Sequence, residues 1–102
     1  MKKLFLILFL LTQSLTINAY ISGAGAIDCK ETVEYHTEYR ELEDFLTSWM
    51  QGYISGIDTA LEQDFARNVD ADYLYLSVIN RCKTRPDEYM HEAVEWVYIN
   101  QL

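Results

Sequence analysis

Two cysteines, Cys29 and Cys82, are the feature that most restricts how this chain can fold. They follow an N-terminal segment, Met1 to Leu11, in which two lysines precede an apolar run, the layout of a secretory signal peptide. That run is shorter than the ~20 residues that a membrane-spanning helix needs. Because an even number of cysteines in a short exported protein is typical of disulfide bonding, the sequence predicts one structural disulfide.

The N-terminal segment offers two cleavage sites. One lies after Ala19, and the other lies after Ala26, where the preceding residues match the A-x-A pattern more closely but stand farther from the apolar run. Cleavage at either bond leaves both cysteines in the mature chain. We therefore predict a signal peptide within residues 1–26, one domain over residues 27–102, and a location in the periplasm.

The charge balance is strongly acidic, with 16 Asp and Glu residues against 8 Lys and Arg residues. Two of those cations, Lys2 and Lys3, belong to the predicted signal peptide. Nucleic acid and anionic membrane surfaces are poor partners for such a chain, so neither is expected to bind. So many carboxylates also predict a fold that is sensitive to acid below about pH 4, where they become protonated.

Helical periodicity dominates the chain, and strand-type alternation is absent. The longest helix is predicted over about 40–63, where apolar side chains recur every three or four residues: Leu42, Phe45, Leu46, Trp49, Met50, Tyr53, Ile54, Ile57 and Leu61. Their arc is wide, so this is predicted to be the central core helix, with Trp49 as a core or subunit-interface anchor. Gly52, Gly56 and Ala60 recur on its flank, where we expect another helix to approach closely.

Shorter helices are predicted on both sides of the central one. Asp28 and Glu31 have capping-box spacing, which predicts a helix that begins at Cys29. A polar turn over 68–72 precedes a third helix, and Pro86 fits the first turn of a last one. The side chains expected to point inward from these two helices are Leu74, Tyr75, Val78, Cys82, Tyr89, Ala93, Trp96 and Val97. The predicted fold is all-α, a small single-domain bundle of three to four helices tied by one disulfide.

No pattern in the chain indicates an enzyme. His91 and Glu92 begin the zinc signature H-E-x-x-H, but Glu95 replaces its second histidine. A calcium loop that began at Asn68 would lack both its glycine and its bidentate glutamate. We therefore predict no catalytic residue, no metal site and no cofactor.

A combination of short motifs is more informative than any one of them. Between the cysteines stands W-x-x-G-Y-x-S-G, from Trp49 to Gly56, and C-K-x-x-P begins at Cys82. With the signal peptide, the acidic turn at Asp70 and the amphipathic last helix, this pattern resembles the HdeA/HdeB family of small periplasmic proteins over essentially the whole mature chain.

The resemblance implies an all-helical fold around a Cys29–Cys82 bridge, a homodimer at neutral pH and, as in the best-known members, an acid-activated holdase chaperone. Its partners would be unfolded periplasmic proteins. The surface uncovered by acid, which would bind clients or form the subunit interface, would include Trp49, Tyr53, Ile54 and Ile57.

A second resemblance leads to another class of function. The stretch from Gly52 to Gly56 and the ending from Arg85 to Tyr89, with Ala93, are also similar to the Rap/Tai immunity proteins, which protect bacteria from secreted toxins. An acidic helical domain suits the neutralisation of a basic cognate toxin. Those proteins tend to carry more cysteines, one of them near the G-Y motif, where this chain has Trp49. A third alternative is an envelope protein with neither activity.

Overall fold

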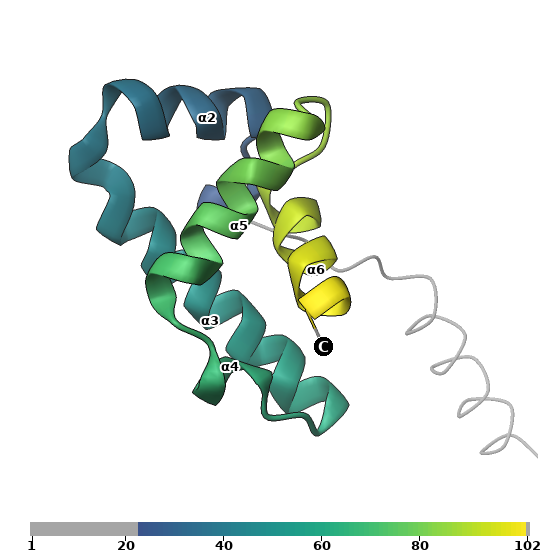
Figure 1. The fold of residues 1–102 in the computed structure, drawn as a ribbon. Coiled ribbons are helices and arrows are strands. Elements are labelled where there is room, and N and C mark those ends of the chain that lie inside the picture. Colours follow the sequence, from purple (N-terminus) through teal and green to yellow (C-terminus); the bar gives the residue numbers. More distant parts are fainter. Residues whose placement is uncertain (1–22, 102) are drawn as a thin grey trace, which may run out of the picture.

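The structure, a computed structural model, describes residues 23–101 and contains helices as its regular elements there (Figure 1). Five are α-helices: α2 (Cys29–Glu38), α3 (Glu43–Leu61), α4 (Phe65–Asn68), α5 (Ala71–Thr84) and α6 (Met90–Gln101). Two are short 3₁₀ helices, η1 (Gly23–Ala26) and η2 (Arg40–Leu42). The predicted all-α class is confirmed, with four helices of ten or more residues and the single turn of α4.

Side-chain caps start two of the helices, α2 at the residue that the sequence predicts and α5 within the polar turn predicted over 68–72. Asp28 accepts a hydrogen bond from the backbone N–H of Glu31 at 2.8 Å, so α2 begins at Cys29. Asp70 accepts one from the N–H of Tyr73 at 3.1 Å, and α5 begins at the next residue. Each carboxylate satisfies an N–H group that a helix start leaves without an intrahelical partner.

Helix α5 lies at the centre of the domain and packs against α2, α3 and α6 (Figure 1). Three helices supply most of the hydrophobic core. The buried apolar side chains are those of α3 (Leu46, Met50, Ile54), α5 (Leu74, Tyr75, Val78, Ile79, Cys82) and α6 (Met90, Ala93, Val94, Val97, Tyr98). The long helix therefore supplies one wall of the core, while α5 is the element that touches every other wall.

The Cys29–Cys82 disulfide is present and fully buried, with the two Cα atoms 4.6 Å apart. It joins the first residue of α2 to the last turn of α5. Backbone hydrogen bonds reinforce the same end of the molecule, because the Cys29 N–H donates to the Glu88 carbonyl at 2.7 Å and the Met90 N–H donates to the Ile27 carbonyl at 2.8 Å.

The start of the last helix differs from the prediction. Helix α6 begins at Met90, four residues after Pro86. Residues 86–88 form a turn instead, since the carbonyls of Pro86 and Glu88 accept hydrogen bonds from the first N–H groups of α2. The prediction that this helix buries Tyr89 and Trp96 is also wrong: their side chains are 52% and 40% exposed, respectively, whereas Ala93 and Val97 are buried as expected.

Among the described residues, no helix packs on the glycine flank of α3. A Cβ atom added at Gly52 or Gly56 would find no atom within 4 Å, and Ala60 is exposed. The expected close helix approach along this flank is therefore wrong for the folded chain, because α5 and α6 pack on the opposite, larger apolar face of α3.

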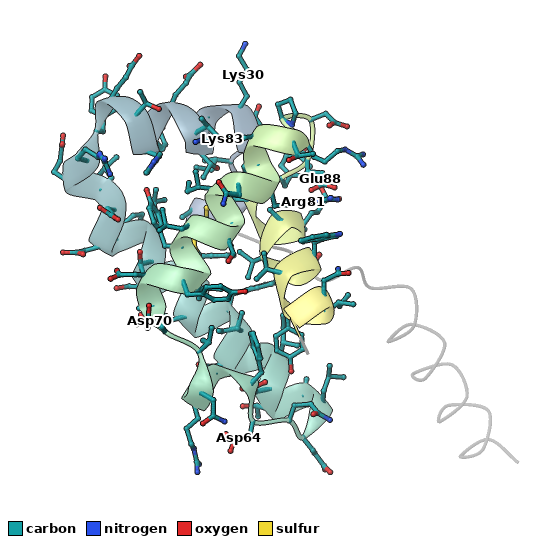
Figure 2. All side chains as sticks on the ribbon, viewed as in Figure 1. Lys30, Asp64, Asp70, Arg81, Lys83 and Glu88 are labelled. Atoms are coloured by element: carbon teal, nitrogen blue, oxygen red, sulfur yellow. A yellow bond between two sulfur atoms is a disulfide. The ribbon has the colours of Figure 1, made fainter. Side chains whose placement is uncertain are left out.

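A partly buried ion pair holds the loop before α6 against α5. Figure 2 shows Arg81 and Glu88 close together beside α6. The guanidinium of Arg81 donates two hydrogen bonds to the Glu88 carboxylate, at 2.6 and 3.1 Å, and stands 4.6 Å from the centroid of the Trp96 ring. Trp96 thus covers the ion pair instead of entering the core.

Replacing Arg81 with alanine is expected to lower the free energy of unfolding by about 2 kcal/mol, because the carboxylate of Glu88 is left without its cation in a site only 14% exposed. The matched control is Arg85→Ala, which removes an exposed pair with Asp87 and is expected to change stability by about 0.5 kcal/mol or less. Urea unfolding followed by circular dichroism compares the two variants. Equal losses of unfolding free energy would show that the Arg81–Glu88 pair stabilises the fold no more than the exposed pair does.

Within the described residues, no helix is both long enough and apolar enough to cross a membrane.

Candidate functional site

The carboxylate of Asp58 joins three helices at the end of the molecule opposite to the disulfide. Asp58 lies in the last turn of α3 and is only 8% exposed. Its Oδ1 accepts hydrogen bonds from the Tyr98 hydroxyl of α6 at 2.7 Å and from the Phe65 N–H of α4 at 3.2 Å. Its Oδ2 accepts one from the Ala66 N–H at 2.7 Å. We call these four residues the Asp58 junction.

The chain reversal after α3 builds the Asp58 junction. Glu62 adopts a left-handed backbone conformation (φ 55°), which ends the helix. The N–H groups of Glu62 and Gln63 both donate to the backbone carbonyl of Asp58. The chain thereby turns back on itself, so the first amides of α4 meet the Asp58 side chain, and the Phe65 ring packs edge-on against Tyr98 with centroids 5.1 Å apart.

Hydrogen bonding stabilises the charged form of Asp58. Burial by itself would raise the pKa of this carboxyl, but the hydrogen bonds from Tyr98, Ala66 and Phe65 outweigh burial and hold the pKa below its usual value of 3.8. The same contact with Asp58, together with burial, raises the pKa of Tyr98 to about 12. Tyr98 therefore remains a hydrogen-bond donor at every physiological pH, and Asp58 is the member of the junction that acid can change.

A histidine near the other end of the core also makes the folded state less stable in acid. His36 of α2 faces the Tyr75 hydroxyl of α5, 2.8 Å from its Nδ1. Burial, followed by the charges of Arg40 and Lys83, lowers the pKa of His36 below its usual 6.5, and Glu43 opposes this only weakly. Because the pKa of His36 is lower in the folded state, neutral His36 favours folding, and this stabilisation is lost as the pH falls below the usual value of 6.5 and through the lower folded value.

An aromatic cluster occupies the face between α3 and α6. The rings of Trp49 and Tyr53 are stacked, with centroids 5.0 Å apart, and the Tyr53 hydroxyl donates a 2.5 Å hydrogen bond to Glu95. Burial and the Glu95 carboxylate both raise the pKa of Tyr53. The Nδ1 atom of His91 lies 3.5 Å from Glu95 and has no hydrogen-bond partner among the described residues.

The four residues predicted for the client-binding or interface surface do not form an open surface in the folded chain. Ile54 is completely buried, and Trp49, Tyr53 and Ile57 are partly buried against the core. Ile54 and Ile57 stand within one helical turn of Asp58 on α3. In the folded chain Ile54 is therefore inaccessible to another protein, whereas Ile57 is partly exposed.

An apolar groove does lie open between η1, α2 and α3, and we call it the α2–α3 groove. Its lining residues are Gly23, Ala24, Ile27, Tyr35, Tyr39, Leu42, Phe45 and Leu46. Phe45 is 60% exposed and Tyr39 is 47% exposed. Phe45 belongs to the apolar arc that the sequence predicts for the long helix, but Tyr35 of α2 and Tyr39 just after α2 carry no periodic signal that would have placed them opposite it.

The Asp58 junction was not predicted from the sequence, although the spacing of residues on the long helix indicates that Asp58 faces inward. Asp58 follows Met50 and Ile54 at intervals of four residues, which places a lone carboxylate on the inner face of the helix. An acid at a core position needs hydrogen-bond partners, but those partners lie 7, 8 and 40 residues away in the chain. Only the folded structure identifies them.

Among residues 23–101, no group of three or more His, Cys, Asp or Glu side chains is arranged to hold a metal ion. Comparisons of the chain with protein-family models, with curated proteins and with solved structures found no match.

Proposed function

We propose that this protein is an exported, acid-activated holdase chaperone, similar to the HdeA/HdeB family, that binds unfolded periplasmic proteins at low pH. The observation that carries the proposal is the Asp58 junction, because one buried carboxylate there holds α3, α4 and α6 together. A junction that needs a charged carboxylate weakens when acid neutralises that group.

The positions of the junction and the disulfide support partial opening rather than complete unfolding. The disulfide ties the start of α2 to the end of α5, whereas the junction ties the ends of α3 and α6 to α4, and Figure 1 shows these regions at opposite ends of the bundle. Loss of the junction frees the end that carries Ile54 and Ile57, while the covalent bridge keeps the rest of the chain compact.

The change in net charge on acidification also favours opening of the domain. All 16 carboxylates lie within the described residues, together with six of the 8 Lys and Arg residues. Near neutral pH the domain is therefore strongly negative, and complete protonation of its carboxylates leaves only positive groups. The positive charges then repel one another across a small core, which adds to the effect of losing the junction.

At neutral pH we propose a homodimer. The α2–α3 groove supports this, because an apolar hollow with Phe45 and Tyr39 exposed is stabilised when a second copy removes it from water. The trigger for client binding would then be the combined opening of the junction and separation of the subunits.

The test is light scattering by an acid-sensitive client at pH 2 to 3, with and without this protein, alongside dye binding to apolar surface from pH 7 to 2. We expect suppressed client aggregation at equimolar protein, increased dye binding below pH 4, and sedimentation as a dimer at pH 7 but not at pH 3. A sample in which the disulfide is reduced and alkylated is the control, since neither the disulfide nor the Asp58 junction then holds its end of the bundle at low pH. Unchanged aggregation at equimolar or higher protein would exclude the chaperone function.

Toxin immunity is the second candidate, and one observation favours it. An apolar hollow beside α4 is lined by Phe65, Val69 and Tyr73 and also by Asp64 and Asp70; Figure 2 shows Asp64 at the lower end of the molecule and Asp70 higher up, at the start of α5. Such a hollow suits a basic side chain of a partner protein. Survival of cells that express a toxin encoded beside this chain, only when this chain is co-expressed, would support immunity.

A further inference from the structure

The segment just before α2 is built into the domain. Residues Gly23–Ala26 form η1, which contacts both α3 and α6. Ala24 is only 7% exposed and belongs to the hydrophobic core, and Gly25 is buried as well. This segment belongs to residues 20–26, which lie between the two candidate cleavage sites of the signal peptide.

Gly25 accommodates the indole ring of Trp49. A Cβ atom added at Gly25 would overlap the Trp49 ring carbons Cη2 and Cζ2, and a Cβ atom at Gly23 would come within 3.3 Å of the indole nitrogen. The glycines of α3 provide the contrast, because added Cβ atoms there meet nothing within 4 Å. Gly25 is therefore required by its neighbour, whereas Gly52 is not.

Backbone hydrogen bonds connect the segment Gly23–Ala26, through Ile27, to the start of α6. The Ile27 N–H donates to the Ala24 carbonyl at 3.3 Å, and the Ile27 carbonyl accepts from Met90 at the start of α6. A cut after Ala26 would remove Ala24 from the core and uncover one face of Trp49. It would also place a charged α-ammonium on Ile27, which is partly buried against the apolar cluster.

The same packing explains why Ala24-Gly25-Ala26 resembles a cleavage motif. Ala24 is small because it is enclosed in the core, and Gly25 lacks a side chain because Trp49 occupies the space. Their small size therefore has a structural cause that does not depend on recognition by a peptidase. The weaker motif, which ends at Ala19, lies outside the described residues and closer to the apolar run.

We propose that the mature protein begins at Tyr20, and that residues Gly23–Ala26 are a retained part of its folded domain that seats Trp49. Processing is then hydrolysis of the Ala19–Tyr20 peptide bond, in which one water molecule yields the Ala19 carboxylate on the released leader and the Tyr20 α-ammonium on the mature chain. The inference rests on the proposed export of the protein.

The experiment expresses the full chain in a Gram-negative host, isolates the periplasmic protein and determines its N-terminus and intact mass. We expect Tyr20 as the first residue of the major species. Ala19→Gln is expected to block processing, so that precursor accumulates, whereas Ala26→Gln, at an exposed position, leaves the N-terminus unchanged. Ile27 as the first residue would overturn this inference but leave export intact, whereas uncleaved protein confined to the cytoplasm would overturn both.

A stability comparison tests the retained segment independently of processing. Gly25→Ala is expected to lower the melting temperature by roughly 10 °C, since Trp49 must move out of its place. Gly52→Ala is the matched control, because its methyl group meets nothing and alanine favours a helix, so the melting temperature should stay the same or rise slightly. Equal melting temperatures for the two variants would contradict the packing role of the segment.

Discussion

Reduction of the Cys29–Cys82 disulfide is expected to lower the melting temperature of this protein by tens of degrees. The bridge links residues 53 positions apart, and in the chain-entropy model the closure of such a loop stabilises the folded state by roughly 4 kcal/mol. That figure is comparable to the whole net stability of a small domain. Thermal unfolding monitored by circular dichroism at pH 7, with and without reductant, measures the effect.

The composition of the chain makes this experiment specific. The sequence contains two cysteines in total, so a reductant has no other disulfide to break. A Cys29→Ala/Cys82→Ala double variant should unfold at the same temperature as the reduced protein and should be insensitive to reductant. Mass spectrometry of the oxidised protein should show the loss of two hydrogens. Two alkylatable thiols in folded protein, or a melting temperature unchanged by reduction, would contradict a structural role for the bridge.

Asp58→Asn is expected to lower the melting temperature at pH 7 by roughly 5–15 °C and to weaken its dependence on acid. Asparagine has one amide oxygen, so an NH₂ group replaces one carboxylate oxygen and leaves a donor of the junction without an acceptor. The hydrogen bonds concerned come from Tyr98, Phe65 and Ala66. Thermal unfolding of both proteins at a series of pH values from 7 to 2 provides the measurement.

The sign of the pH dependence follows from the lowered pKa of Asp58. A carboxyl whose pKa is lower in the folded than in the unfolded state stabilises the fold above the unfolded value, near 3.8. This stabilisation is lost as the pH falls through the lower folded value. The difference in melting temperature between the original protein and Asp58→Asn should therefore be full at pH 5 to 7 and should shrink below pH 4.

A nearby carboxylate supplies the control for the Asp58 variant. Asp64 is exposed and forms only a surface ion pair with Arg67, so Asp64→Asn should change the melting temperature by no more than about 3 °C. Tyr98→Phe removes the hydroxyl donor of the junction and keeps the ring, and it should also make the melting temperature less sensitive to acid. If Asp64→Asn and Asp58→Asn gave the same pH profile, the acid response would come from net charge and not from the junction.

Local patterns in the sequence predicted most of the helical elements. The predicted cap at Asp28 marks a helix start that the structure confirms, because a capping bond involves residues only three apart. Asp70 caps α5 within the predicted polar turn over 68–72. The apolar arc of the long helix similarly predicted the buried positions Leu46, Met50 and Ile54. The disulfide was also predictable, since a chain with two cysteines has one intramolecular pairing.

The predictions from sequence were wrong where a contact with a distant segment overrides the local preference of a residue. Pro86 has the residue type of a helix start, but the first turn of α2 takes up the carbonyls of residues 86 and 88, and α6 begins at Met90. Trp96 lies on the apolar side of its helix, yet it covers the Arg81–Glu88 ion pair at the surface. Neither competing contact has a signature in the neighbouring sequence.

The helical class, the single disulfide and the strong excess of carboxylates can all be read from the sequence, because each depends on composition or on spacing within a few residues. Three other features follow from the folded structure alone: Asp58 is the carboxylate that joins three helices, the α2–α3 groove lies open, and Gly25 must lack a side chain because Trp49 lies against it. Each of these depends on which residues far apart in the chain come within a few ångströms of each other. Hydrogen bonding and close packing act at that range, and periodicity along the chain carries no record of it.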